Sequence, residues 1–152
     1  MAAADTLMMD PRIARNMDDP VSVLRRSKRI AVVGASATPG KDAHEIPKYV
    51  ADHGYDVVPV NPRGGEIFGR TAYRSLAEVP GPIDLVDVFR PSEEAPGIAR
   101  EAAAAGAKGL WLQTGLTSDE AARIAKEAGM AYVEDACIRV VARRIEYLDS
   151  QE

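Results

Sequence analysis

Short apolar stretches alternate along the chain with longer segments in which apolar and polar residues are mixed. The apolar stretches span residues 29–33, 56–60, 85–89, 109–112 and 130–133, and their length suits strands that are buried on both faces. The mixed segments between them are long enough to form helices. This alternation predicts a parallel sheet covered by helices, because parallel strands need a long crossover that usually contains a helix.

Residues that favour helix starts and ends divide the mixed segments. A lead-in helix is expected to begin at Pro20 and to end near Arg26. A second helix is predicted over residues 44–53, with Pro47 in its first turn and Gly54 at its end. Further helices are expected over 91–105, from the capping box at 117–120 to about 129, and over 139–148. Right-handed crossovers then favour a doubly wound, Rossmann-like α/β fold with a single domain over residues 18–152, preceded by an N-terminal extension over 1–17.

Composition and charge exclude several classes of protein. With 46% hydrophobic and 28% charged residues, the chain is expected to be globular. Its net charge of −4 argues against general nucleic-acid binding, so a phosphate site must be local. No apolar run approaches the roughly 20 residues of a membrane helix, and residues 1–10 lack a secretory pattern. Because Cys137 is the single cysteine, no internal disulfide can form, and we expect a cytoplasmic protein.

The turn after the first strand has the composition of a phosphate-binding loop. Ligands of doubly wound sheets bind outside the carboxyl ends of the strands, so the residues that follow each strand are the informative ones. The turn contains small residues that allow close approach of a ligand, and N–H groups at the next helix start could cradle a pyrophosphate. Ser36 and Thr38 add hydroxyl groups and Lys41 adds a charge. The candidate residues are Gly34, Ala35, Ser36, Ala37, Pro39 and Lys41, and an ordinary strand-to-helix turn is the alternative.

The second strand ends in Val60, Asn61, Pro62 and Arg63. A dinucleotide fingerprint would have glycines where Ser36 and Pro39 stand, and an acidic residue after the second strand to receive a ribose hydroxyl. Arg63 suits a phosphate better, which favours coenzyme A, with its 3′-phosphate, or NADP, with its 2′-phosphate. A solvated surface arginine remains the alternative.

Two further strand ends add candidates to the same edge. Phe89, Arg90 and Pro91 follow the third strand, and Gln113 and Gly115 follow the fourth. In a doubly wound sheet these residues converge with the first two loops. Taken one by one, Phe89 could be core, Arg90 surface and Gln113 a helix cap.

Several motifs, in this order, resemble those of the small stand-alone CoA-binding proteins. The resemblance covers the chain from about Val23 to Tyr147 and rests on Val33-Gly34-Ala35-Ser36, Pro39-x-Lys41, Gly54-Tyr55, Val60-Asn61-Pro62, Ile67-x-Gly69, Tyr73-x-Ser75-Leu76, residues 84–90 and Trp111-Leu112-Gln113-x-Gly115. The family is similar in fold to the N-terminal CoA-binding domain of the succinyl-CoA synthetase alpha subunit. The resemblance implies a CoA-binding domain over residues 18–152, with coenzyme A held by the Gly34–Ser36 loop, by residues 60–63 and by the loops after Phe89 and Gln113.

The chain also departs from the pattern of the family it resembles. Members often have an arginine before the cysteine, where this sequence has Ala136 before Cys137, so a role of that arginine does not transfer. The phosphohistidine domain and the ATP-grasp partner of the synthetase have no counterpart here, so the resemblance does not imply that this chain forms a thioester by itself.

The sequence shows no complete catalytic or metal-binding set. His44 and His53 lie nine positions apart on one predicted helix, on opposite faces, so they cannot bind one metal, and His44 is expected to be exposed. Cys137 is expected to be a buried, inert thiol, with a mixed disulfide to CoA as the alternative. Carboxylates at strand ends commonly cap helices or pair with arginine. No spacing singles out a catalytic pair of carboxylates among Asp84, Asp87, Glu134 and Asp135.

Two classes of function follow. The first is a module that binds CoA or acyl-CoA, without a catalytic centre, acting as carrier, sensor or partner of an acyl-CoA enzyme. The second is an NADP-dependent or acyl-CoA-linked enzyme whose active site the sequence does not reveal. The ligand is expected to be a small molecule, and the protein partners left open are a second copy of the chain and an acyl-CoA enzyme.

Overall fold

Five parallel strands form one sheet in the computed structural model, which describes residues 17–151. The sheet order is β2-β1-β5-β6-β7. The strands are β1 (Arg29–Val33), β2 (Asp56–Val60), β5 (Leu85–Val88), β6 (Gly109–Leu112) and β7 (Ala131–Val133). The predicted doubly wound, Rossmann-like α/β fold is therefore confirmed. From β1 the chain first adds β2 on one side and then adds β5 on the other side of β1. Such a change of direction is a switch point, and ligands bind there in open α/β sheets.

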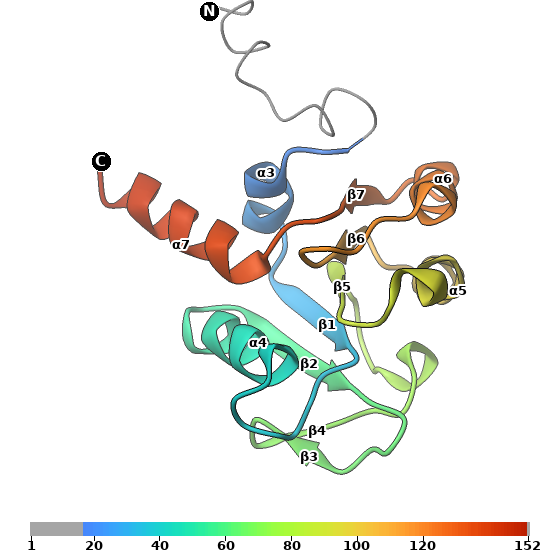
Figure 1. The fold of residues 1–152 in the computed structure, drawn as a ribbon, viewed down its shortest axis with the longest axis horizontal. Coiled ribbons are helices and arrows are strands. Elements are labelled where there is room, and N and C mark those ends of the chain that lie inside the picture. Colours follow the sequence, from blue (N-terminus) through green and yellow to red (C-terminus); the bar gives the residue numbers. More distant parts are fainter. Residues whose placement is uncertain (1–16, 152) are drawn as a thin grey trace, which may run out of the picture.

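Helices cover both faces of this sheet (Figure 1). One face packs against α3 (Pro20–Arg25), α4 (Asp42–Asp52) and α7 (Ile138–Asp149), and the other against α5 (Ala95–Ala104) and α6 (Asp119–Glu127). Successive residues of a strand point to opposite faces. Accordingly, Leu85 belongs to the core under α4 and α7, whereas Val86 belongs to the core under α5 and α6.

Helix α4 starts earlier than its sequence suggests. It begins at Asp42, so the prediction that Pro47 lies in the first turn is wrong, and this proline stands inside the helix. A proline there cannot donate to the carbonyl four residues earlier, which belongs to Ala43. The Ser36 N–H donates to that carbonyl instead, at 3.0 Å. The helix thus tolerates Pro47 because the turn after β1 supplies the missing donor.

The segment between β2 and β5 contains a small hairpin that the sequence did not predict. It pairs β3 (Glu66–Ile67) with β4 (Arg70–Thr71) and is followed by the 3-10 helix η1 (Leu76–Glu78). Next to the hairpin, the Tyr73 N–H donates to the Pro59 carbonyl at 3.0 Å, and the Tyr73 carbonyl accepts from the Asn61 N–H at 2.8 Å. This pairing fixes the chain beside the carboxyl end of β2.

The chain before α3 lies beside β7. Asp18 donates its N–H to the Tyr132 carbonyl and accepts the Tyr132 N–H at Oδ2, both at 2.8 Å. Met17 packs into the core, whereas the rest of the predicted extension, residues 1–16, lies outside the described residues. Among residues 17–151, none of the helices has the length and apolar character that a bilayer span requires.

Candidate functional site

Two cavities lie at the carboxyl ends of the strands, where the sequence predicts the site. The first, here called the Arg74 cavity, measures about 350 Å³ and is lined by Val33, Gly34, Val60, Pro62, Arg74, Ser75, Leu76, Arg90, Glu94, Ile98 and Glu101. The second, the Phe89 cavity, measures about 550 Å³ and is lined by Asp42, Ile46, Phe89, Arg90, Pro91, Gln113, Thr114, Leu116, Cys137 and Arg139. Arg90 borders both, so the two cavities meet at the end of β5.

Gly34 is fixed where the loops after β1 and β5 touch. Its φ of 91° lies in the left-handed region that favours glycine. A Cβ atom at this position would lie 2.9 Å from Arg90 Cδ and 3.0 Å from the Phe89 carbonyl oxygen. Only a residue without a side chain therefore lets the Arg90 loop approach the turn this closely.

Arg90 is held at the border of the cavities by Glu94. Its Nε donates to Glu94 Oε1 at 3.1 Å and its Nη2 to Oε2 at 2.7 Å. This bidentate hydrogen bonding raises the pKa of Arg90 and lowers the pKa of Glu94. A guanidinium has five N–H donors. The bidentate pair with Glu94 uses two of them.

The turn after β1 uses its own N–H groups differently from the prediction. Gly34 donates to the Val60 carbonyl at 3.1 Å, Ser36 to the Ala43 carbonyl and Thr38 to Ser36 Oγ, the last two at 3.0 Å. These three donors are already satisfied inside the protein. The turn therefore contributes its shape. At the start of α4 the N–H groups of His44 and Glu45 donate to the Lys41 carbonyl, at 2.9 and 2.8 Å, so the N–H groups of Asp42 and Ala43 are the ones that helix geometry leaves without an acceptor in the helix.

The loop after β2 is tied to the turn after β1 by Asn61. Its Nδ2 donates to the Ala35 carbonyl and its Oδ1 accepts the Arg63 N–H, both at 2.8 Å. The Arg63 side chain itself is exposed and lines neither cavity, and the same is true of Lys41. Asn61 thus holds the two loops together, and its amide is used for structure.

The guanidinium that does line a cavity beside β2 is Arg74, which the sequence did not single out. The hairpin and the pairing of Tyr73 with Pro59 carry it there. Gly64 leaves room for its side chain, because a Cβ at Gly64 would lie 3.2 Å from Arg74 Nε. No local pattern around Arg74 could have revealed this placement.

The predicted residues divide into two groups. Those that line a cavity are Gly34, Val60, Pro62, Phe89, Arg90, Pro91 and Gln113. Those that line neither are Ala35, Ser36, Ala37, Pro39, Lys41, Asn61, Arg63 and Gly115. The cavity residues that sequence reasoning missed include Arg74 and also Ile46, Leu116 and Arg139, which come from helices and from a loop beyond the strand ends.

A buried carboxyl group lies beneath the Phe89 cavity. Asp87 is 1% exposed, and burial raises the pKa of its carboxyl to about 7. Gln113, itself 5% exposed, donates from Nε2 to Asp87 Oδ1 at 2.5 Å and accepts the Ile138 N–H at Oε1 at 3.3 Å. Asp87 therefore does not pair with an arginine, as is common for strand-end carboxylates, but bonds an amide that also binds the start of α7.

The histidines and the cysteine are placed as follows. The His44 side chain is 12% exposed and its Nδ1 lies 2.7 Å from the Ser36 carbonyl, so the prediction of an exposed His44 is wrong. His53 stacks on Tyr49 with ring centroids 3.8 Å apart. Cys137 is half-buried and lines the Phe89 cavity as the N-cap of α7. Within residues 17–151, no three histidine, cysteine or acidic side chains are arranged to hold a metal ion.

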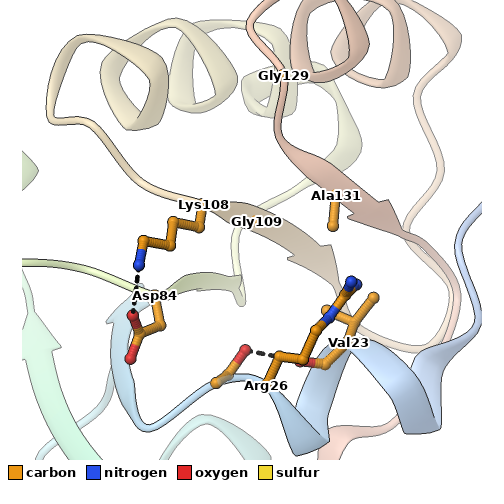
Figure 2. A pocket seen from close by; sticks show the side chains of 8 residues that line it. Val23, Arg26, Asp84, Lys108, Gly109, Gly129 and Ala131 are labelled. Carbon is orange, nitrogen blue, oxygen red and sulfur yellow. Dashed lines mark hydrogen bonds and ion pairs between the residues drawn. The ribbon is translucent and has the colours of Figure 1, made fainter.

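A third cavity, of about 250 Å³, lies at the opposite edge of the sheet (Figure 2). Asp84 and Lys108 point toward one another there, with 4.0 Å between Oδ1 and Nζ. The Asp84 carboxylate accepts the N–H groups of Arg29 and Lys28 at 2.9 Å, and these hydrogen bonds lower its pKa. None of the predicted site residues lines this cavity, and its polar groups hold β1 and β5 together.

Comparisons with known proteins give one matching family model and several relatives. Residues 28–143 match the family model described as CoA binding domain. The chain is 47% identical over 118 residues to the protein YneT of Bacillus subtilis (strain 168), across 78% of this chain and 87% of that protein. It is also similar to a solved structure described as a hypothetical protein from Pyrococcus horikoshii OT3, with a TM-score of 0.80 and 38% identity over 85% of this chain and 91% of that one.

A third relative is much longer than this chain. It is the acetate–CoA ligase (ADP-forming) of Methanocaldococcus jannaschii, 36% identical over 87 residues, which are 57% of this chain and 12% of the ligase. The similarity to the ligase is therefore a similarity to one of its parts. With most of its length matched by the family model, the chain belongs to the CoA-binding domain family.

Proposed function

We propose that this protein binds coenzyme A or an acyl-CoA across the carboxyl edge of its sheet and has no catalytic centre of its own. The observation that carries the proposal is the meeting of two cavities of different character at Arg90, which packs closely against Gly34. CoA has a phosphorylated nucleotide at one end and a long, largely uncharged arm at the other. Two joined cavities suit such a ligand better than one round pocket would.

Each part of CoA has a matching part of the site. In our proposal the nucleotide end lies in the Arg74 cavity and the pyrophosphate lies by the Arg90 guanidinium and the start of α4. The thiol end lies in the Phe89 cavity, whose walls include Ile46, Phe89 and Leu116. These apolar side chains favour the arm and a short acyl group over a charged nucleotide.

Arg63 and Arg74 are the two arginines that could bind the ribose phosphate of CoA. The sequence predicts that it lies near Arg63 or Lys41, whereas the cavity lining favours Arg74. We expect Arg74→Ala to weaken CoA binding about tenfold more than dephospho-CoA binding, because a charge-assisted hydrogen bond is worth about 1.5–3 kcal/mol. Arg63→Ala, which removes an exposed guanidinium from the neighbouring loop, is the matched control and should leave both affinities nearly unchanged.

Calorimetric titration of the wild type and both variants with CoA, dephospho-CoA and NADP tests the proposal. Saturable binding of CoA with an Arg74-dependent preference over dephospho-CoA supports it. Clean binding of NADP without binding of CoA would instead favour the alternative function, an NADP-dependent oxidoreductase. Equal losses for CoA and dephospho-CoA in Arg74→Ala would remove Arg74 from the ribose phosphate.

The proposal extends to partners and setting. A domain of this family makes up a small part of the acetate–CoA ligase of Methanocaldococcus jannaschii. We therefore propose that this chain hands CoA to, or senses it for, a separate enzyme that acts on acyl-CoA, with a second copy of the chain as the other partner to test. A free Cys137 suits a cytoplasmic setting.

A further inference from the structure

We propose that Asp87 is a positioning residue for the Phe89 cavity: its ionised carboxylate orients the Gln113 amide, and the amide fixes the start of α7, so that ligand affinity follows the ionisation of Asp87. This inference rests on the proposed binding of CoA at the carboxyl edge. Asp87 itself does not line the cavity; it acts through Gln113, which does.

The geometry allows one orientation of the Gln113 amide. Its Oε1 accepts the Ile138 N–H, so its Nε2 must be the group that faces Asp87. An ionised carboxylate only accepts hydrogen bonds, which matches the Nε2 donor. Both ends of the amide are thereby satisfied, and the chain of contacts runs from the middle of β5 to the first residue of α7.

Protonation of the Asp87 carboxylate disturbs this arrangement of hydrogen bonds. It adds a donor hydrogen to a carboxyl group whose hydrogen-bond partner is Gln113. If the amide turns to accept that hydrogen at Oε1, its NH₂ group faces the Ile138 N–H, and two donors oppose one another. The start of α7 then loses its hydrogen bond to Gln113. Cys137 and Arg139, which flank Ile138, are part of the cavity wall and move with it.

Both forms of Asp87 are populated near neutral pH, because burial raises its pKa to about 7. Other charged or ionisable side chains stand near the cavity: Asp42 and His44 on α4, Arg90 after β5, and Cys137 and Arg139 at the start of α7. An experiment on pH dependence must therefore separate Asp87 from these groups. Asp87→Asn does so, since it leaves all of them in place and removes the ionisation of the side chain at position 87.

The test is a titration with dephospho-CoA at about pH 6 and about pH 8. This probe lacks the ribose phosphate, whose second ionisation near pH 6 would otherwise add its own pH dependence. If only the ionised form is competent, affinity falls in proportion to its population, so the wild type should bind about tenfold more tightly at the higher pH. Asp87→Asn should bind with nearly the same affinity at both.

The outcomes separate this inference from the proposed function. A wild-type affinity that does not change with pH, or an Asp87→Asn variant that keeps the wild-type profile, overturns the positioning role while CoA binding stands. If neither dephospho-CoA nor CoA binds at either pH, the proposed function is overturned as well. Should the variant fail to fold, a wild-type affinity that does not rise between the two pH values still overturns the positioning role. A purely structural Asp87 would weaken stability with rising pH without strengthening binding.

Discussion

The wild type should lose about 3 kcal/mol of folding stability between about pH 5 and pH 8, and Asp87→Asn should not show this loss. Burial raises the pKa of Asp87 from 3.8 to about 7, so the native state holds a proton that the unfolded chain has released. Stability from this group is therefore fully present below the unfolded pKa and lost as pH rises through the folded one. Urea denaturation of both proteins at the two pH values measures the difference.

The matched control is Asp84→Asn. The pKa of Asp84 is lowered, chiefly by the Arg29 N–H, so its contribution is present above the unfolded pKa and is lost in acid. Asp84→Asn should therefore leave the dependence of folding stability on pH between about pH 5 and pH 8 as it is in the wild type. If the stability of Asp87→Asn falls with pH as steeply as that of the wild type, Asp87 is not the group that causes the loss in this pH range.

Gly34→Ala should cost on the order of 2–4 kcal/mol of folding stability and weaken CoA binding at least tenfold. Alanine is strained at a φ of 91°, and its Cβ meets Arg90 Cδ at 2.9 Å and the Phe89 carbonyl oxygen at 3.0 Å. The carbonyl belongs to the backbone, so the loop after β5 must move, and Arg90 moves with it. Denaturation and calorimetric titration of the variant measure the two effects.

Gly40 provides the control for backbone strain within the same turn. Its φ of 94° is nearly that of Gly34, but a Cβ there meets no atom within 4 Å. Gly40→Ala should therefore show only the conformational cost, about 1 kcal/mol, and near-normal binding. Equal effects of the two substitutions would mean that the contact between Gly34 and the Arg90 loop does not matter.

The sequence predicted the sheet well because its strands are local patterns. Each of the five is a short apolar run next to a helix signal, and the structure has a strand at each of these places. The position of Gly34 also followed from local chemistry, since a glycine that ends a strand at the switch point is a marker of close approach. The start of α6 near residues 117–120 was confirmed, but the capping box was not, because the N-cap is Ser118, whose side chain accepts the N–H of Ala121, a residue with no side-chain acceptor of its own.

What the sequence missed depends on contacts between distant segments. Arg74 reaches its cavity through a hairpin of two-residue strands, too short to produce a periodic pattern. Helix α4 includes Pro47 only because Ser36, outside the helix, donates to the carbonyl that the proline leaves free. Asp87 was visible as a carboxylate in an apolar strand, but its partner Gln113 is 26 residues away.

A crystal structure of the complex with CoA tests the central claim most directly. The account predicts the pyrophosphate beside Gly34 and Arg90, the nucleotide end in the Arg74 cavity and the thiol end in the Phe89 cavity, near Gln113 and Cys137. CoA ordered at the opposite edge of the sheet, in the cavity between Asp84 and Lys108, would contradict it.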